Sequence, residues 1–232
     1  MSNLMRLSDL QAARPPSAAD QVFEALYRQV VTLGLPPGAR LSEAEVARAA
    51  GVSRQPVRDA FWRLSQLGFL TIRPQRSTEV SAISVRAVQQ ARFVRTALEI
   101  EMVRLAAERF SPVEIATLEA LLDDQAAAIA AGDRERFHGL DDEFHRQICV
   151  LCGHDYAWTL IREQKAHMDR VRFMSLSFGA QSALDDHVVI LDALRVGDVP
   201  GSVVAMRTHL SRIEDHLPRI RAEHGEHFRS EG

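Results

Sequence analysis

The chain has 232 residues, of which 46% are hydrophobic and 25% are charged, and its net charge is −3. These values allow one large domain or two smaller ones with hydrophobic cores. No stretch approaches the ~20 uninterrupted apolar residues of a membrane span, and the first twenty residues lack the apolar core of a signal peptide, so we expect a soluble, cytoplasmic protein without a membrane partner.

The two parts of the chain differ in charge. Residues 1–80 hold ten arginines and seven acidic residues, whereas residues 81–232 hold eighteen basic and twenty-four acidic residues together with all nine histidines. Such asymmetry indicates a polyanion partner for the first part and a different task for the second. We therefore expect a flexible N-terminus (1–19), a first domain (20–82), a second domain (85–222) and a tail (223–232).

Two helices are predicted at the start of the first domain. Apolar residues recur at helical spacing over residues 22–33, and Gly34 ends the pattern. Ser42 and Glu45 have the spacing of a capping box, which predicts the start of a second helix.

A third helix and a hairpin are predicted next. Gly51 ends the second helix, and Ser53 can cap a third helix with apolar positions between 57 and 64. A short connection of this kind is typical of a helix-turn-helix. Residues 69–72 and 79–81 read as two strands joined by a basic turn, which predicts a wing.

Arginines in this domain are the predicted contacts to DNA. Arg54 and Arg58 lie four apart, on one face near the start of the third helix, where a guanidinium can bind guanine with two hydrogen bonds. The other predicted contacts are Ser53 and Gln55 beside them, and Arg40, Arg73 and Arg76 on the phosphates. The alternative is a solvated basic face on a small three-helix domain.

The same residues resemble a known family. The matching segments are Pro37-Gly38-x-x-Leu41-Ser42-Glu43, Gly51-Val52-Ser53-Arg54-x-Pro56-Val57-Arg58 and Leu64-x-x-Leu67-Gly68. Over about residues 20–80 they are similar to the DNA-binding domain of the GntR family of bacterial transcription regulators. The wing departs from the family pattern, because Ser77 follows Arg76 where the family has a glycine. The resemblance implies a homodimer on a palindromic DNA operator.

The second domain is predicted to be an antiparallel bundle of about six helices, so the fold as a whole is mainly α. The expected helices are 85–109, 112–131, 133–152, 155–177, 180–196 and 200–222. Ser111, Pro112 and Glu114 combine an N-cap, a proline in the first turn and a capping-box acid. Glycines 132, 153, 179 and 197 are expected to mark helix ends, and residues 224–227 are expected to fray.

Four side chains in the bundle have the chemistry of a divalent metal site. Asp141 and His145 lie on one helix face, and His187 and His209 lie in apolar surroundings on other predicted helices. Three nitrogens and one oxygen suit Zn²⁺, Ni²⁺, Mn²⁺ or Fe²⁺. From the residues alone, a set of satisfied core histidines remains an equal alternative.

Other candidates near this site stay open. Cys149 and Cys152 follow His145, so a thiolate could join a metal, although two small buried residues are the simpler interpretation. His216 is a reserve ligand, and His154 is a candidate helix cap or pocket contact.

This second domain also resembles a known domain. The matching segments are Asp141-x-x-Phe144-His145, Asp186-His187 with Ile190-Leu191-x-Ala193-Leu194-x-x-Gly197-Asp198, and Met206-x-x-His209-Leu210. They are similar to the FCD effector domain of FadR-type GntR regulators, over about residues 85–222. The resemblance implies that the four metal candidates bind a divalent ion whose coordination a small carboxylate completes.

The same resemblance implies an effector contact. Val94-Arg95-x-x-Leu98-Glu99 matches the segment whose arginine lines the effector pocket, so Arg95 is the expected anion clamp. Arg172 is a second candidate. The alternative for both arginines is a plain salt bridge on a helix surface, such as Arg95 with Glu99.

The expected function is a DNA-binding transcription regulator, a repressor released by a small organic acid, and not an enzyme. The alternatives are a metal-dependent hydrolase with the same four metal candidates, a metal-only sensor, and a metal-free regulator that responds to lipid.

Overall fold

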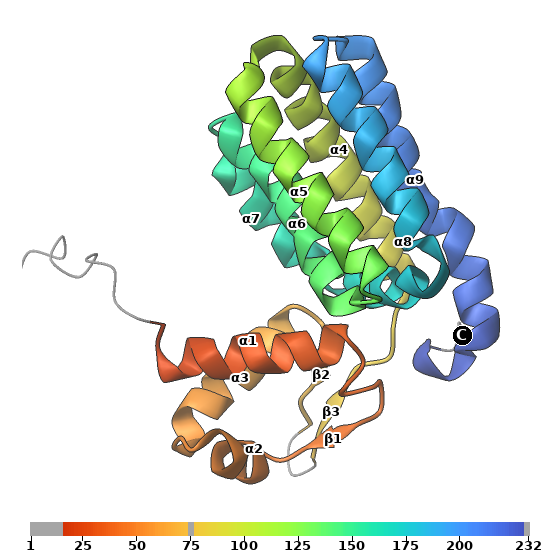
Figure 1. The fold of residues 1–232 in the computed structure, drawn as a ribbon. Coiled ribbons are helices and arrows are strands. Elements are labelled where there is room, and N and C mark those ends of the chain that lie inside the picture. The colour runs from red at the N-terminus through yellow and green to blue at the C-terminus, as the bar shows by residue number, and fades with distance from the viewer. Residues whose placement is uncertain (1–15, 74–76, 230–232) are drawn as a thin grey trace, which may run out of the picture.

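The computed structural model describes residues 16–73 and 77–229. Figure 1 shows a small N-terminal unit, the head (residues 18–80), beneath the lower end of a long helical bundle (residues 85–223). The described residues are mostly helical, with one small sheet, so the prediction of a mainly α fold is confirmed.

The described residues of the head form three helices and three short strands. They are α1 (Ala18–Val31), β1 (Arg40–Leu41), α2 (Glu43–Ala50), α3 (Arg54–Gln66), β2 (Leu70–Thr71) and β3 (Thr78–Val80). The sheet is antiparallel with the order β1-β3-β2, and Arg40 lies opposite Glu79. β1 was not predicted, since two residues are too few to show an alternating pattern. Val57, Leu64 and Phe69 are fully buried in the head's own core.

Capping in the head differs from the prediction. α2 begins after Ser42 as expected, but the Ser42 side chain makes no capping hydrogen bond, and neither does that of Ser53 at the start of α3. A complete capping box forms instead at Ser17 and Asp20, so α1 begins at Ala18, within the stretch expected to be flexible. The positions of Pro and Ser residues therefore predicted where the helices begin, but not which side chains cap them.

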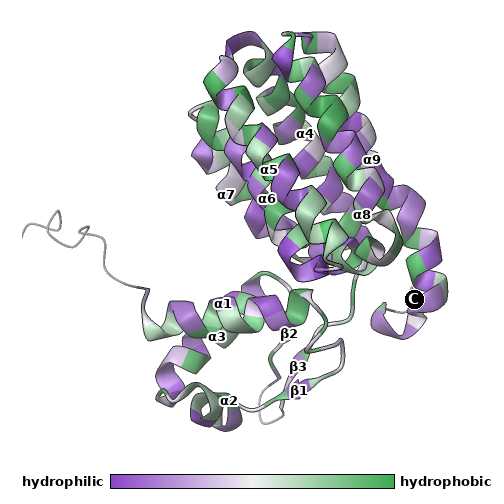
Figure 2. Ribbon diagram, viewed as in Figure 1, coloured by the Kyte–Doolittle hydropathy of each residue, from purple (hydrophilic) through white to green (hydrophobic). Residues whose placement is uncertain are grey.

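Six helices form the bundle. They are α4 (Val85–Arg109), α5 (Pro112–Ala130), α6 (Arg134–Leu151), α7 (Asp155–Gln164), α8 (Ala166–Arg195) and α9 (Val199–Glu223). The predicted capping box at Ser111 and Glu114 is present at the start of α5. In Figure 2 hydrophilic and hydrophobic residues both occur along the bundle helices, as expected where one side of each helix faces a shared core.

One predicted helix boundary is wrong. The break expected at Gly179 lies instead at Lys165, so α7 is short and α8 runs through Gly179 for 30 residues. A Cβ at position 179 would lie 2.8 Å from Cε1 of His216 on α9. Glycine at this position therefore permits close packing of two helices rather than ending one.

The expectation that residues 224–227 fray is also wrong. After α9 the chain makes a 3₁₀ turn (Gly225–His227), and Phe228 pairs with Ile83 in the link between β3 and α4. The Ile83 amide donates to the His227 carbonyl at 2.8 Å, and the Arg229 amide donates to the Ile83 carbonyl at 2.8 Å. Both paired side chains belong to a small core at the junction of head and bundle, which fixes this part of the tail.

No helix in the described ranges is long and apolar enough to cross a membrane.

Candidate metal centre

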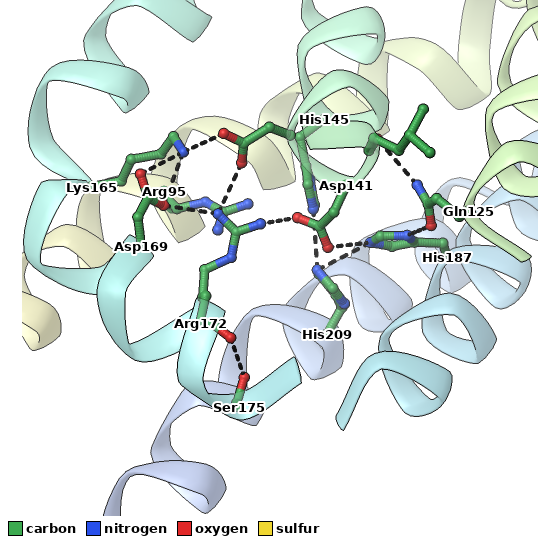
Figure 3. A network of polar contacts seen from close by, with 12 residues as sticks. Arg95, Gln125, Asp141, His145, Lys165, Asp169, Arg172, Ser175, His187 and His209 are labelled. Atoms are coloured by element: carbon green, nitrogen blue, oxygen red, sulfur yellow. Dashed lines mark hydrogen bonds and ion pairs between the residues drawn. The ribbon is translucent and has the colours of Figure 1, made fainter. Parts of the chain in front are cut away.

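The structure brings together the four residues predicted as metal ligands. Asp141 and His145 extend from α6, His187 from α8 and His209 from α9 (Figure 3). Nε2 of His209 lies 3.1 Å from Nε2 of His145 and 3.4 Å from Nε2 of His187, and Oδ1 of Asp141 lies 3.6 Å from Nε2 of His187. At most a tenth of any of these side chains is exposed. Four ligand atoms therefore face one small buried volume.

The opposite nitrogen of each ring faces an oxygen from another part of the bundle. Nδ1 of His145 lies 2.6 Å from Oε2 of Glu99 on α4, and Nδ1 of His187 lies 2.9 Å from Oε1 of Gln125 on α5. Nδ1 of His209 lies 3.6 Å from Oδ2 of Asp186. Such acceptors favour the neutral tautomer with the proton on Nδ1, most directly at His145 and His187, and in that tautomer the Nε2 lone pair faces inward.

Burial keeps the His187 and His209 rings neutral. Loss of hydration lowers the pKa of His209 to about 4, against a smaller opposing effect of Asp186. The pKa of His187 lies well below its usual value, first because the ring is buried and then because His209 and His145 are close. A neutral imidazole is the form that binds a metal, whereas an imidazolium is not a ligand.

The donor set fits a divalent metal ion. Nitrogens bound to one tetrahedral Zn²⁺ lie ~3.3 Å apart, which is close to the separations of the three Nε2 atoms. Three inward lone pairs and a carboxylate also repel one another unless a cation or protons lie between them. The four residues would hold the ion, and Glu99 and Gln125 would orient two of the rings.

A cavity opens beside this cluster. It measures about 60 Å³ and is bordered by Asp141, His209 and two serines, and also by four arginines: Arg92, Arg95, Arg172 and Arg212. Arg95 is almost fully buried, and its Nε donates to Oε1 of Glu99 at 2.5 Å. The surface salt bridge considered from the sequence is therefore a buried one, which leaves the rest of the Arg95 guanidinium facing the cavity.

Arg172 has both of the roles considered for it. It lies on the cavity wall, and it forms ion pairs with Asp141, Asp142 and Asp169. Burial lowers the pKa of Arg172 to about 9, so it stays charged at neutral pH. The guanidinium thus contacts a predicted metal ligand directly.

The other histidine and cysteine candidates lie outside the four-residue cluster. Cys149 and Cys152 are buried in the bundle core, where burial raises their pKa values to about 12 and 11. His216 lines the cavity and contacts Gly179, and His154 precedes α7 without a side-chain capping bond. The thiols of Cys149 and Cys152 therefore behave as small core residues.

Comparison with known proteins decides the family. Residues 18–80 match the model of bacterial regulatory proteins of the gntR family, and residues 90–212, more than half of the chain, match the FCD domain. The chain belongs to the GntR family. It is a DNA-binding transcription regulator of the GntR/FCD type.

Relatives of this GntR regulator include two proteins of Escherichia coli. The transcriptional repressor RspR is 36% identical over 91% of this chain and 93% of its own length. The solved structure of McbR/YncC is 24% identical, covers 88% of this chain and 98% of its own, and has a TM-score of 0.76, which shows a shared fold. A protein from Paenarthrobacter nicotinovorans described as a probable D-xylose utilization operon transcriptional repressor is 27% identical over 84% of this chain. Regulators, rather than the metallohydrolases considered from the sequence, are thus the class to which the chain is related.

The predicted DNA contacts of the GntR regulator lie mostly on the exposed side of α3. Arg54, Gln55 and Arg58 are exposed, and so is Ser53 just before the helix. Arg58 donates from Nε and Nη2 to the Glu43 carboxylate at 3.3 and 3.1 Å, and Gln55 donates to Asp59 at 2.8 Å. Arg54 and Arg58 thus share an accessible face.

The remaining predicted DNA contacts lie near the sheet. Arg40 on β1 and Arg73 after β2 are exposed and border one shallow pocket, whereas Arg76 lies outside the described residues.

Sequence reasoning missed the outer residues of the centre. Gln125 stands in an apolar stripe with Leu118 and Leu122, at spacings of seven and three, and its side chain is fully buried. An amide among apolar residues at helical spacing is the sequence signal that could have identified it, because a buried amide needs hydrogen-bond partners. Glu99 was named only as a partner of Arg95. Its contact with His145 joins two helices that are far apart in the sequence, so no local pattern reveals it.

Proposed function

We propose that this GntR regulator is a cytoplasmic repressor whose affinity for its operator is controlled by a small carboxylate bound at a divalent metal ion. Asp141, His145, His187 and His209 would hold the ion, which would be Zn²⁺, Ni²⁺, Mn²⁺ or Fe²⁺. The observation that carries this proposal is that the Nε2 atoms of three histidines converge, while the Nδ1 atoms of the same rings face oxygen atoms on the outer side of the cluster. A metal ligand cluster is the arrangement that uses such geometry.

The charge of the adjoining cavity supports an anionic effector. Nη2 of Arg95 is buried without a hydrogen-bond partner within the described part of the chain, and the cavity also borders Asp141 and His209. A carboxylate there could reach the ion with one oxygen and Arg95 with the other. Arg95 would then bind the effector through a charge-assisted pair, and Arg172 would be a second contact.

The head supports the operator part of the proposal. Two heads in a homodimer would place two copies of α3 in successive major grooves of a palindromic site. Arg54 and Arg58 would contact bases beside Ser53 and Gln55, and Arg40, Arg73 and Arg76 would contact phosphates. Glu43 would hold the Arg58 guanidinium in place before DNA binds.

A thermal-shift experiment tests the effector and metal together. The metal content of purified protein is measured, and its melting temperature is then recorded with acetate, pyruvate, lactate, malonate, succinate and citrate, with and without a chelator. We expect at least one acid to raise the melting temperature of the metal-loaded protein by several degrees, and the chelator to remove this effect. His209→Ala should abolish it, whereas His154→Ala, an exposed histidine outside the cluster, should not. A metal-free protein that responds equally to these acids would contradict the proposal.

A further inference from the structure

The first turns of α8 contact both the head and the candidate metal centre. Asp169 and Arg170 are fully buried and bind the head, while Arg172, less than one turn further along, forms an ion pair with Asp141. Nη1 of Arg170 donates to the backbone carbonyl of Ser81, just after β3, at 2.6 Å. One rigid element therefore joins the two parts of the molecule.

The contact of Asp169 with the head is a partly buried hydrogen bond from Tyr27 on α1. The Tyr27 hydroxyl donates to Oδ2 of Asp169 at 2.9 Å, and its ring packs edge-on against Phe69 with the ring centres 5.2 Å apart. A hydrogen bond to an ionised acceptor is stronger than a neutral one, and burial increases the cost of losing it. The position of α1 against the bundle thus depends on the Asp169 carboxylate.

The same carboxylate is shared with the site. Oδ1 of Asp169 accepts from Nη1 of Arg172 at 3.0 Å and from Nζ of Lys165 at 2.9 Å (Figure 3). Arg172 also lines the cavity and pairs with Asp141. A second anion in the cavity would compete with Asp169 for the Arg172 guanidinium, because one cation would then face an additional negative group.

We propose that Tyr27, Asp169 and Arg172 form the coupling path through which occupancy of the cavity changes the position of the head. Tyr27 is a positioning residue in this path and touches neither effector nor DNA. This inference rests on the proposed function for the identity of the cavity ligand. A ligand shifts an equilibrium only by its differential interaction with two states. Here the two states would differ in how strongly Arg172 pairs with Asp169.

Other polar contacts between the head and the bundle lack this connection. Arg162 donates to Glu24, one turn before Tyr27 on α1, at 2.6 Å, but about half of each side chain is exposed. Arg28 and Glu135 are more exposed still, with 3.5 Å between the paired atoms. Neither pair includes a residue of the cavity. Glu24 therefore offers a matched control on the same helix.

A double-mutant cycle tests the path without an effector. Operator affinity is measured by fluorescence anisotropy, on a duplex obtained by selection from random DNA, for the wild type, Arg172→Gln, Tyr27→Phe and the double variant. We expect Arg172→Gln to change the affinity at least threefold, and this change to fall below 1.5-fold when Tyr27 is replaced by Phe. Tyr27→Phe keeps the ring that packs against Phe69 and removes only the hydroxyl. Only a coupling energy of this kind separates a path from mere proximity.

In a cycle with Glu24→Gln, the effect of Arg172→Gln should persist unchanged. The path would be overturned if the effect of Arg172→Gln survives in Tyr27→Phe, or if it disappears equally in Glu24→Gln. It would also be overturned if Arg172→Gln has no effect on operator affinity. Circular dichroism verifies folding, and Arg172→Lys, which keeps the charge but loses the planar fork, replaces Arg172→Gln in the cycle if that variant is unfolded.

An effector arm separates this inference from the proposed function. The acid among the six that gives the largest thermal shift is added to wild type and Tyr27→Phe. We expect similar binding to both proteins, with the change in operator affinity at least threefold smaller in Tyr27→Phe. If no acid binds, the proposed function fails while the mutant cycle still tests the path. If an acid binds and releases both proteins from DNA equally, the path fails while the proposed function stands.

Discussion

At the scale of single residues, the candidate centre depends on side chains that would not themselves bind the ion. Each histidine has an oxygen beside Nδ1, from Glu99, Gln125 or Asp186, and the first two lie within hydrogen-bonding distance. Gln125 is the one neutral group of the three. Its amide also donates to the Leu140 carbonyl at 3.2 Å, which fixes which end of the amide faces His187.

Replacing Gln125 should therefore weaken metal binding without removing a ligand. In Gln125→Leu the His187 ring loses the acceptor that fixes its tautomer, and outer contacts of this type are typically worth a factor of about 10–100 in metal affinity. Competition with a chromophoric chelator measures the change. Gln181→Leu, an exposed site on α8, should leave the affinity unaltered. Equal affinities for Gln125→Leu and wild type would show that Gln125 does not orient His187.

At the scale of elements, two glycines inside helices differ in what surrounds them. Gly139 lies on the exposed face of α6, and a Cβ there would meet nothing within 4 Å. Gly179 lies in α8, where the same atom would come within 2.8 Å of His216 on α9. The first glycine weakens its helix without any packing role, whereas the second allows α8 and α9 to approach.

Alanine should separate these two roles. Gly139→Ala should raise the free energy of unfolding by about 0.5–1 kcal/mol, since alanine loses less backbone entropy in a helix. Gly179→Ala should show no such gain, because the new methyl group displaces His216. The gain should reappear in the double variant Gly179→Ala, His216→Ala, relative to His216→Ala alone. Urea unfolding followed by circular dichroism measures the wild type and the four variants, and equal stabilisation by Gly139→Ala and Gly179→Ala would refute the packing role.

At the scale of the whole molecule, several buried histidines make stability depend on pH. Burial lowers the pKa of His138 to about 3 and those of His167 and His209 to about 4, and that of His187 lies well below 6.5. Unfolding exposes these rings, which then take up protons below pH 6.5. Burial raises the pKa of Asp169 to about 6, so this carboxyl binds a proton more readily in the folded chain than in the unfolded one. This single group offsets only part of the effect of the histidines on stability.

The metal-free protein should therefore lose stability as the pH falls from about 6.5 to 4. About three more protons are bound by the unfolded than by the folded chain near pH 5.5, which corresponds to a loss of about 4 kcal/mol per pH unit. Urea unfolding at pH 7, 6 and 5 in the presence of a chelator checks this slope. A free energy of unfolding that is constant over this range would mean that the rings are already protonated in the folded state.

The sequence predicted what depends on local spacing, and it failed where distant segments decide. Helical periodicity and the Ser111 capping box located most helices, because both signals lie within a few residues of one another. The helix end predicted at Gly179 was wrong, since a glycine can either end a helix or allow a neighbouring helix to pack closely. The metal candidates came from residue chemistry and resemblance, whereas the contacts of Glu99 and Tyr27 require the folded chain.

The position of α8 has a consequence for genetics. Between Lys165 and Arg172 this helix carries the contacts to Tyr27 and Ser81 on one side and to Asp141 on the other. On the proposed coupling path, substitutions here would alter DNA affinity and effector response together, although Lys165, Asp169 and Arg170 are buried. Random mutagenesis of the regulator, with a reporter gene behind its operator, would therefore yield both constitutive and non-inducible alleles from this short segment.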